Sequence, residues 1–547
     1  MSNRFMKGAM ILSLSMFVSR ILGLLYVIPF QRLVGPTGLA LYGYAYVPYN
    51  LLLTLSTLGI PIGVAKFISK YNAVKAYRTS RNVFRLGMVF MIFLGLVGFL
   101  IMWFGAPFFA NVVMDGSDMH NTLDDVVLAI RMVSFAVIVV PPMSILRGFF
   151  QGNQDMAPTA ISQLIEQLVR VTLIVVGSFI VVRILGGSAQ MAVKISVFAA
   201  FVAGVSALFV LYRYWLRKKG DFDALLPLSR PHPKRSLTAL FKELLSYALP
   251  FAILSLIATW FQLIDTVTFN SAMLRAGVDP TLTEEIFGIY IAALPKIIMI
   301  PVSFAIAFGQ PLVPEITEKI QLGNSKAVHK TLGSAIMLTS FVTIPAVVGM
   351  ALLSNPLYIM LFPHSEELNQ IGGSMFGIGA FIGIFMAINA IIAAIMQGID
   401  RQYKALIFLL VATVIKFIGN IILIPMFQVN GAIAATFLAY GICVLLNYLE
   451  IRKRTGIATR KILKQHISIF VFTALMAISV WLTMQVLSIF FDYTQSSLIS
   501  AVYVLAATIV GVVVYAGLAI HFGLVRMLFG DKFSYSRIRA RFRRSKS

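Results

Sequence analysis

The stretch RGFFQGNQDMAPTAISQLIEQLVR, residues 147–170, joins the end of one apolar run to the start of another through a short polar turn. A similar stretch, AAIMQGIDRQYKALIFLLVATVIK, follows about 246 residues later at 393–416. The matching residues are Gln151-Gly152 with Gln397-Gly398, and Arg170 with Lys416. The repeats of solenoid proteins are only about 20–50 residues long, so a repeat of about 246 residues is too long to be a solenoid repeat. It predicts that the chain consists of two similar halves.

The similarity between the halves extends beyond these two stretches. Residues 66–81 match 315–330, with Lys70 aligned to Lys319, and the Ala-Pro pair at 106–107 aligns with Asn-Pro at 355–356. The predicted divisions of the chain are an N-terminal lobe at 1–220, a basic cytoplasmic linker at 221–244, a C-terminal lobe at 245–455, two further helices at 456–525 and a basic tail at 526–547.

The composition places the chain in a membrane. Of 547 residues, 59% are hydrophobic and only 12% are charged, and the mean hydropathy is +0.89. A soluble domain could not bury so much apolar surface. The net charge of +24 does not require nucleic acid, because membrane proteins carry excess cations in their cytoplasmic loops. The single cysteine, Cys443, lies in an apolar run and excludes a disulfide framework.

Fourteen apolar runs are each long enough to cross a hydrocarbon core of about 30 Å as a helix. They lie at 8–33, 42–66, 84–109, 126–150, 158–183, 190–216, 245–270, 286–312, 330–353, 372–396, 404–427, 430–451, 466–490 and 498–522. Long continuous runs of this kind are typical of helices and not of barrel strands. The predicted fold is an all-α integral membrane protein with two pseudo-symmetric six-helix lobes and two C-terminal helices.

The charges between the runs set the predicted orientation. If the N-terminus is cytoplasmic, basic clusters such as 217–219 and 452–454 lie inside, and acidic residues such as Asp118, Glu284 and Glu366 lie outside. Gaining or losing one span would invert every later loop. We therefore expect both termini in the cytoplasm.

Six charged residues fall inside predicted spans, where a charge costs about 2.5–3.5 kcal/mol at the helix centre on insertion scales. They are Arg20, Glu166, Arg170, Asp265, Lys296 and Lys416. Glu166 and Arg170 stand one helical turn apart with the acid first, and we interpret them as a neutralised intramembrane pair. The first span contains no carboxylate, so Arg20 is a candidate anion site. Lys296, between two prolines, is a second candidate.

A separate candidate site concerns ions. Asp265 shares a polar helix face with Gln262 and Asn270, and it either pairs with Lys416 or holds a cation. The residues leave both readings open. The residues assigned to this ion or charge-compensation site are Asp265, Lys416, Asn420 and Thr436.

Enzymatic signatures are weak. Asp221-Phe222-Asp223 has the D-x-D form that sugar-nucleotide transferases use to hold a metal, but its short basic linker leaves no room for a nucleotide-binding domain. The sequence has no Ser/His/Asp arrangement and no cluster with metal-ligand spacing. We predict no catalytic residue, metal or cofactor.

Four segments resemble the MurJ-type Lipid II flippases of Gram-positive bacteria, which belong to the multidrug/oligosaccharidyl-lipid/polysaccharide (MOP) superfamily together with stage V sporulation protein B. The segments are SRILGLLYVIPF at 19–30, the block from Arg147 to Val171, IMIPVSFAIAFGQPLVPEI at 298–316 and GAIAATFLAYG at 431–441. The resemblance covers essentially the whole chain.

The resemblance implies a MOP-type fold with a central cavity, alternating access, and a groove along the last two helices for a polyprenyl tail. It assigns substrate binding to cavity cations. Arg20 falls on the first-span arginine of the family's SR-x-LG motif, and Lys296 falls where relatives carry an arginine on the eighth span. Tyr26 and Thr54 stand where Gram-negative members carry further cavity arginines.

We therefore expect a flippase that moves the undecaprenyl-pyrophosphate-linked peptidoglycan precursor, Lipid II, to the outer leaflet of the bacterial plasma membrane. The implied partners are this lipid-linked saccharide, membrane lipids and the cell-wall synthesis machinery, with no nucleic acid, and the implied state is a monomer. Alternatives are a flippase for another lipid-linked polysaccharide or a sporulation-specific paralogue, then a drug/cation antiporter, then a membrane glycosyltransferase or polymerase.

Overall fold

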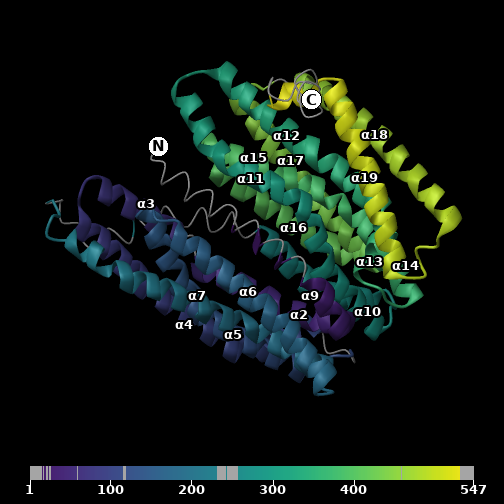
Figure 1. The fold of residues 1–547 in the computed structure, drawn as a ribbon, viewed down its shortest axis with the longest axis horizontal. Coiled ribbons are helices and arrows are strands. Elements are labelled where there is room, and N and C mark those ends of the chain that lie inside the picture. The colour runs from purple at the N-terminus through teal and green to yellow at the C-terminus, as the bar shows by residue number, and fades with distance from the viewer. Residues whose placement is uncertain are drawn as a thin grey trace, which may run out of the picture. The chain divides into compact units, whose positions relative to one another are not determined.

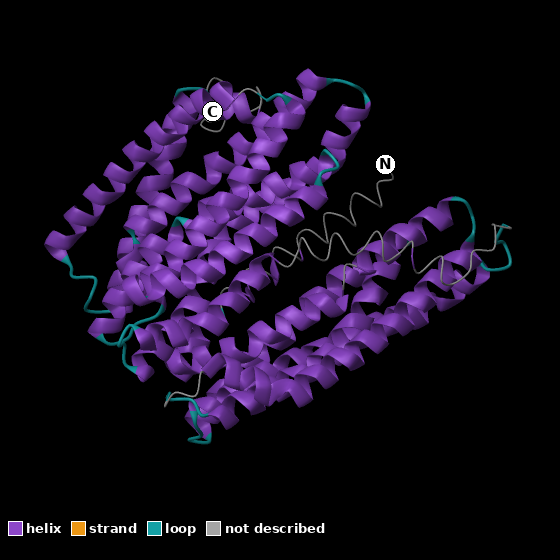
Figure 2. Cartoon of the chain, turned by 180° about the vertical axis from the view of Figure 1, so that it is seen from behind, coloured by secondary structure: helices purple, strands orange, loops and turns teal. Residues whose placement is uncertain are grey.

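The computed structural model describes residues 26–57, 60–114, 119–230, 257–457 and 459–529, with isolated positions at 15, 18–19, 22–23 and 242. Within these ranges every regular element is a helix, as Figures 1 and 2 show. The all-α class predicted from the sequence is therefore confirmed. A helix satisfies its own backbone hydrogen bonds, which an apolar medium requires.

The chain divides into two compact units, Met1–Ala293 and Leu294–Ser547. The described helices of unit 1 are α2 (Val27–Thr57), α3 (Ile60–Ala73), α4 (Tyr77–Met114), α5 (Leu123–Gly152), α6 (Ala157–Phe179), the π-helix η1 (Ile180–Ile184), α7 (Ala189–Ala224), α9 (Ile257–Arg275), α10 (Pro280–Gly288) and the π-helix η2 (Ile289–Ala293). Those of unit 2 are α11 (Leu294–Gln321), α12 (Ser325–Leu352), α13 (Ser354–Leu361), α14 (Glu366–Ala380), α15 (Ile382–Gly398), α16 (Gln402–Phe427), α17 (Val429–Thr455), α18 (Thr459–Phe490), α19 (Ser497–His521) and α20 (Leu524–Phe529).

Eleven helical segments of the described chain are long and apolar enough to cross a membrane. They coincide with eleven of the predicted runs. The other three runs, 8–33, 42–66 and 245–270, each include residues outside the described part. The protein is thus a multi-pass membrane protein, and the total of fourteen spans remains a prediction.

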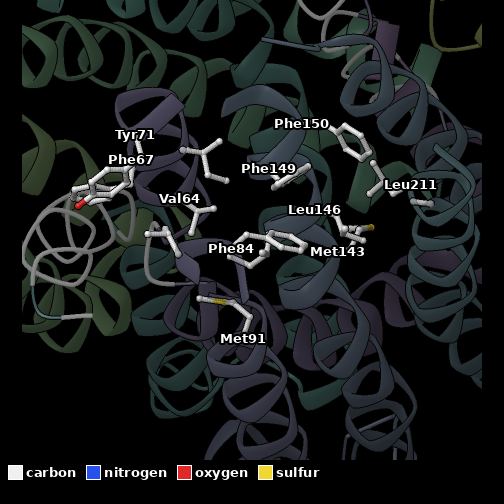
Figure 3. Close-up of a cluster of buried hydrophobic side chains, with 14 of the residues drawn as sticks. Val64, Phe67, Tyr71, Phe84, Met91, Met143, Leu146, Phe149, Phe150 and Leu211 are labelled. Carbon is white, nitrogen blue, oxygen red and sulfur yellow. The ribbon is translucent and has the colours of Figure 1, made fainter. Parts of the chain in front are cut away.

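Helix α5 is the central element of unit 1 and packs against α2, α3, α4 and α7. Its side chains Met143, Leu146 and Phe149 meet Phe84 of α4 and Leu211 of α7 in a buried cluster. Figure 3 shows this cluster, with Val64 and Phe67 of α3 beside it. In unit 2, α11 packs on α12 and α15, while α18 and α19 pack on each other and on α12 and α13 respectively.

Short polar side chains start several helices. Each accepts a hydrogen bond from the first turn and so satisfies a backbone N–H that has no partner within the helix. These caps are Thr122 for α5, Ser188 for α7, Asp279 for α10, Asn324 for α12, Ser365 for α14 and Ser496 for α19. Helix α2 is interrupted at Gly35, whose φ of 71° is not helical, and this break falls between the predicted first and second spans. Half of the first span lies outside the described residues, so its separate existence stays a prediction.

The repeat found in the sequence is present in the backbone. The turn after α5 contains Gln154 with a φ of 60°, and the turn after α15 contains Asp400 with a φ of 57°. Both turns contain the same backbone hydrogen bond. The N–H of the residue after Gln154 or Asp400 donates to the carbonyl oxygen five positions earlier in the chain. These bonds are Asp155 N–H to Phe150 O, 2.9 Å, and Arg401 N–H to Met396 O, 2.7 Å.

The glycine before each of these turns makes an equivalent contact. A Cβ on Gly152 would lie 2.7 Å from the Ala65 carbonyl oxygen of α3. One on Gly398 would lie 3.3 Å from the carbonyl oxygen of Val313 in α11. Val313 lies 248 positions after Ala65, within one residue of the 249-residue offset between 66–81 and 315–330. In unit 1 the repeated turn therefore packs closely on α3, and in unit 2 it packs closely on α11. A side chain in place of Gly152 or Gly398 would clash with that helix.

The unit boundary lies in the predicted eighth span and not in the linker. Helices α9 and α10 and the π-helix η2, which follow the linker in sequence, pack on α2 within unit 1. The lobe limits of 220 and 245 remain a prediction. Within the linker region, Phe222 packs on Phe149 and Trp215, and Asp223 forms an ion pair of 2.8 Å with Arg81. The D-x-D motif thus has structural contacts.

Glu284 does not lie in an open loop, as the sequence suggested. It is fully buried in α10 and accepts hydrogen bonds from Asn121, one from the backbone N–H at 3.1 Å and one from the side-chain amide at 2.7 Å. Asn121 also donates to the Thr37 carbonyl at 2.9 Å. Glu284 is therefore unsuitable as a probe of the outer surface.

The predicted orientation can be tested with single cysteines in a Cys443→Ser background. Asp124, Glu366, Lys219 and Lys453 are all exposed. We expect cysteines at 124 and 366 to react with an impermeant maleimide on intact cells, and cysteines at 219 and 453 to react only after permeabilisation. Labelling at 219 in intact cells would contradict the fourteen-span topology.

Candidate functional site

The structure places some of the predicted site residues in unit 1 and others in unit 2, and one of them lies outside the described residues. Glu166 and Arg170 lie on α6 and Asp265 on α9, all in unit 1. Lys296 is half-buried in α11, and Lys416, Asn420 and Thr436 lie on α16 and α17, all in unit 2. Arg20 lies outside the described residues.

Glu166 is held by two arginines. Its Oε1 accepts from Arg170 at 2.6 Å, the contact expected from their spacing, and its Oε2 accepts from Arg147 of α5 at 2.9 Å. Arg147 also donates from Nε to the Ser162 hydroxyl at 3.0 Å. The three charged side chains are 13–19% exposed. We call Arg147, Glu166 and Arg170 the arginine cluster.

The local fold explains how the arginine cluster forms. Ser162, Glu166 and Arg170 are spaced by four residues and share one face of α6. The turn at Gln154 reverses the chain, so the last turns of α5 run beside the first turns of α6. Arg147 therefore reaches Glu166, nineteen positions away. Arg147 is the first residue of the repeated block, but its contact with Glu166 could not be predicted from its position in the sequence.

A layer of tyrosines adjoins the arginine cluster. Arg170 donates to the Tyr46 hydroxyl at 3.4 Å, and the Tyr46 ring stacks on Tyr42 with centroids 4.7 Å apart. The Tyr49 and Tyr46 rings meet edge to face with centroids 5.1 Å apart, and the hydroxyl oxygens of Tyr42 and Tyr26 are 3.3 Å apart. These rings come from α2 and the turn before it. They supply hydroxyl groups and an apolar wall next to the guanidinium.

The arginine cluster carries more positive than negative charge. It contains two guanidinium groups and one carboxylate, which leaves a formal charge of +1. A buried charge is costly unless it is paired, so a second anion at this place would be stabilised. Guanidinium groups bind phosphate or carboxylate oxygens through parallel N–H donors. The cluster can therefore take part in binding an anionic group.

Asp265 has its own partner in unit 1. The Tyr290 hydroxyl of η2 donates to Asp265 Oδ2 at 3.0 Å, and the carboxylate is 5% exposed. One turn further along α9, Asn270 donates to the Tyr44 hydroxyl at 2.8 Å and to the Val113 carbonyl at 3.1 Å. These bonds join α9 to η2, α2 and α4.

Lys416 is completely buried in unit 2. Its ammonium donates to the Ala432 carbonyl at 3.1 Å and to the Thr436 hydroxyl, both on α17. Gly419 brings the two helices together, since a Cβ there would lie 2.9 Å from the Ala435 Cβ. The predicted grouping of Lys416 with Thr436 is present. The pairing of Lys416 with Asp265 stays a prediction.

The described residues contain no group of three or more His, Cys, Asp or Glu side chains that could hold a metal ion. Cys443 is buried on α17.

Comparison with known proteins identifies the family. Residues 5–320 match the family model described as "Polysaccharide biosynthesis protein". The Lipid II flippase MurJ of Bacillus subtilis is 37% identical over 533 residues, which cover 97% of this chain and 98% of that protein.

Two solved structures share the fold. A structure of the Lipid II flippase MurJ in an inward closed conformation has a TM-score of 0.64 at 16% identity and covers 94% of this chain and 99% of its own. An inward-facing multidrug resistance transporter of the MATE family and MOP superfamily has a TM-score of 0.65 at 16% identity, covering 79% and 94%. The chain therefore belongs to the polysaccharide biosynthesis protein family and, within the MOP superfamily, to its MurJ-type members.

Proposed function

We propose that the protein is a flippase that moves Lipid II from the inner to the outer leaflet of the plasma membrane by alternating access. The 37% identity to a Lipid II flippase over 97% of the chain carries this proposal. The structure supports it with the arginine cluster, which lies within the spans of unit 1 and has one guanidinium more than it has carboxylates. The protein is a transporter and has no enzymatic role.

The substrate's pyrophosphate defines what the binding site must supply. It is a dense anion whose oxygens match the forked donors of arginine. We assign its binding to Arg20 and Lys296, with Arg170 of the arginine cluster as a further contact. Arg20 precedes Gly23 by three residues, and Gly23 lies beside Gln167 on the helix that carries Glu166 and Arg170.

A drug/cation antiporter needs acidic groups that are available to a cationic substrate. In unit 1, Glu166 is engaged by two arginines, Glu284 by Asn121, and Asp265 by Tyr290. The charge of the arginine cluster has the wrong sign for a cation. This arrangement favours an anionic substrate.

The wider setting follows from the same family. We place the protein in the bacterial plasma membrane as a monomer, with both termini in the cytoplasm. The polyprenyl tail would remain in the lipid along α18 and α19, where Trp481, Leu482 and Val512 are among the exposed apolar side chains. We assign the coupling of ions or charge to Asp265, Lys416, Asn420 and Thr436.

Depletion of the protein combined with a leaflet assay for Lipid II tests the proposed function. We expect Lipid II to accumulate at the inner leaflet and its outer-leaflet pool to fall, with recovery when the gene is restored. Normal outer-leaflet Lipid II, together with loss of another lipid-linked saccharide, would identify that other glycan as the substrate.

Alternating access also predicts that unit 1 contains contacts which must break during transport. Glu284, Asn121 and Thr37, which we call the outer clamp, bind α10 to the start of α5 and to α2. Nearby, Phe287 of α10 stacks on Tyr44 at 4.9 Å, and a Cβ on Gly288 would lie 2.1 Å from the Pro36 carbonyl oxygen. Outward release would require α10 to leave α2.

Stability should respond unequally to substitutions in the arginine cluster. Glu166→Gln leaves two uncompensated guanidinium groups, and loss of a buried partner typically costs about 3–5 kcal/mol. Arg147→Gln or Arg170→Gln leaves one balanced pair and should fold. We expect thermal unfolding in detergent to show a large loss for Glu166→Gln alone, with Gln167→Ala as the control. Equal losses in all three charge variants would contradict the assignment of an excess positive charge.

Arg20 should be needed for transport and not for folding. We expect Arg20→Ala to be made and inserted at normal levels but not to support growth of a strain depleted of the wild-type protein. Arg20→Lys should keep partial activity, because lysine retains the positive charge but lacks the parallel N–H donors of the guanidinium. A well-expressed Arg20→Ala protein that supports normal growth would remove Arg20 from the site. If Arg20 pairs with Glu166 instead, Arg20→Ala with Glu166→Gln should restore folding.

The outer clamp should control the outward-open population. Asn121→Ala removes the side-chain donor to Glu284 and leaves a buried carboxylate with fewer partners, a loss of about 1–3 kcal/mol. We expect a larger distance between spin labels at 124 and 282 in the variant, measured by electron paramagnetic resonance. Asp124→Cys and Leu282→Cys in otherwise unchanged protein give the reference. An unchanged distance distribution would show that the clamp does not hold the closed state.

A further inference from the structure

Glu284, in the outer clamp, is a fully buried carboxyl group that forms no ion pair within the described chain. Its two oxygens accept hydrogen bonds from Asn121, one from the side-chain amide at 2.7 Å and one from the backbone N–H at 3.1 Å. Glu166, by contrast, is held by two arginines. A buried carboxylate without a cation is strongly disfavoured, and the neutral acid relieves that cost.

Several titratable or charged groups lie on the elements that pack against α10. Those that interact electrostatically with Glu284 from other elements are His120, in the turn before α5, and Tyr44 of α2. The others are Asp265 and Arg275 on α9, Tyr290 on η2, Asp279, which caps α10, and Glu285 within α10. His120 is exposed, and its imidazole contacts Gln190 of α7, with the two Nε2 atoms 3.3 Å apart. In the described chain, Glu284 is thus held by hydrogen bonds from N–H groups and not by an ion pair.

The amide of Asn121 offers an acceptor for a proton on Glu284. Its Nδ2 donates to Glu284 Oε1 and to the Thr37 carbonyl oxygen of α2 at 2.9 Å, so both amide hydrogens are in use and the orientation of the amide is fixed. Its Oδ1 is buried and accepts no hydrogen bond within the described chain, which is unfavourable for a polar atom. A hydroxyl on Glu284 would supply the missing donor, while the other carboxyl oxygen would still accept from Asn121.

Opening of the outer clamp changes the surroundings of Glu284. Outward release requires α10 to leave α2, and the carboxyl group then meets water. In water a glutamate is ionised above about pH 4.3. In the closed clamp, burial without a cation favours the neutral acid. The closed state therefore binds one proton more than the open state at pH values above the titration of an exposed glutamate, and a rise in pH favours opening.

We propose that Glu284 is a proton-binding site, at which the neutral acid donates to Asn121 Oδ1, and that this proton holds the outer clamp closed. The proton is taken from water when α10 closes on α2 and is returned to water when α10 leaves. The importance of this step for transport rests on the proposed function, whereas proton binding and its effect on α10 do not. Only the side of the membrane that supplies the proton depends on the predicted orientation.

Electron paramagnetic resonance on purified full-length protein tests this site. Spin labels at 124 and 282 in a Cys443→Ser background report the ratio of open to closed clamp between about pH 5 and about pH 8, where an exposed glutamate is ionised. Glu284→Gln mimics the neutral acid, since its amide can donate to Asn121 Oδ1. Histidine titrates in the same range, so His120→Gln is measured as well. Glu366→Gln removes an exposed carboxylate and serves as the matched control.

Release of one proton on opening makes the open-to-closed ratio rise by up to about tenfold per pH unit. We expect this rise in the wild type, His120→Gln and Glu366→Gln, and a clamp that stays closed at every pH in Glu284→Gln. Infrared spectra of wild-type protein with isotope-labelled glutamate should show a protonated glutamate that disappears as the clamp opens. This second measurement does not require Glu284→Gln to be stable.

A wild-type ratio that does not change with pH would overturn the proposal, as would a pH dependence that persists in Glu284→Gln. Loss of the pH dependence in His120→Gln would make the imidazole the sensor and would equally overturn it. A ratio that responds to sodium and not to pH would show that Glu284 binds a metal cation instead of a proton. Each of these results leaves the flippase function standing, because the leaflet assay for Lipid II tests that function separately.

Discussion

The charge balance around Glu166 is the constraint on which the site in unit 1 depends. One carboxylate serves two guanidinium groups inside a helix bundle that is surrounded by hydrocarbon. In such a medium each charge needs a nearby partner, because transfer from water costs several kcal/mol per ion. Glu166 makes it possible to keep Arg147 and Arg170 within the spans, and the three side chains together carry a formal charge of +1. The tyrosines of α2 complete the surroundings of Arg170.

The two halves share a fold but not a charge pattern. The turns at Gln154 and Asp400 and the glycine contacts before them are the same in both units. The positions of Arg147 and Glu166, however, correspond to Ala393 and Ala412 in the second half. Only Arg170 has a charged counterpart, Lys416, which is fully buried against α17. A symmetric scaffold thus places a cluster of two arginines and one glutamate in one half and a packed cation in the other.

Features set by local sequence were predictable, and features set by distant contacts were not. The helices follow from long apolar runs, and the contact between Glu166 and Arg170 follows from their four-residue spacing. The burial of Glu284 depends on Asn121, 163 positions away, and the role of Arg147 depends on how a turn aligns two helices. Loop charge alone suggested that Glu284 was exposed. Pairing across units, as for Asp265 and Lys416, stays a prediction for the same reason.

The most direct measurement is Lipid II translocation by the purified protein in sealed vesicles, followed by the appearance of its head group at the opposite surface. The excess guanidinium of the arginine cluster should be required for this step. We expect wild-type protein to accelerate translocation above protein-free vesicles, and folded Arg170→Gln protein to be much slower. A wild type that gives no acceleration would contradict the flippase function. Equal rates for wild type and Arg170→Gln would contradict the role of the cluster.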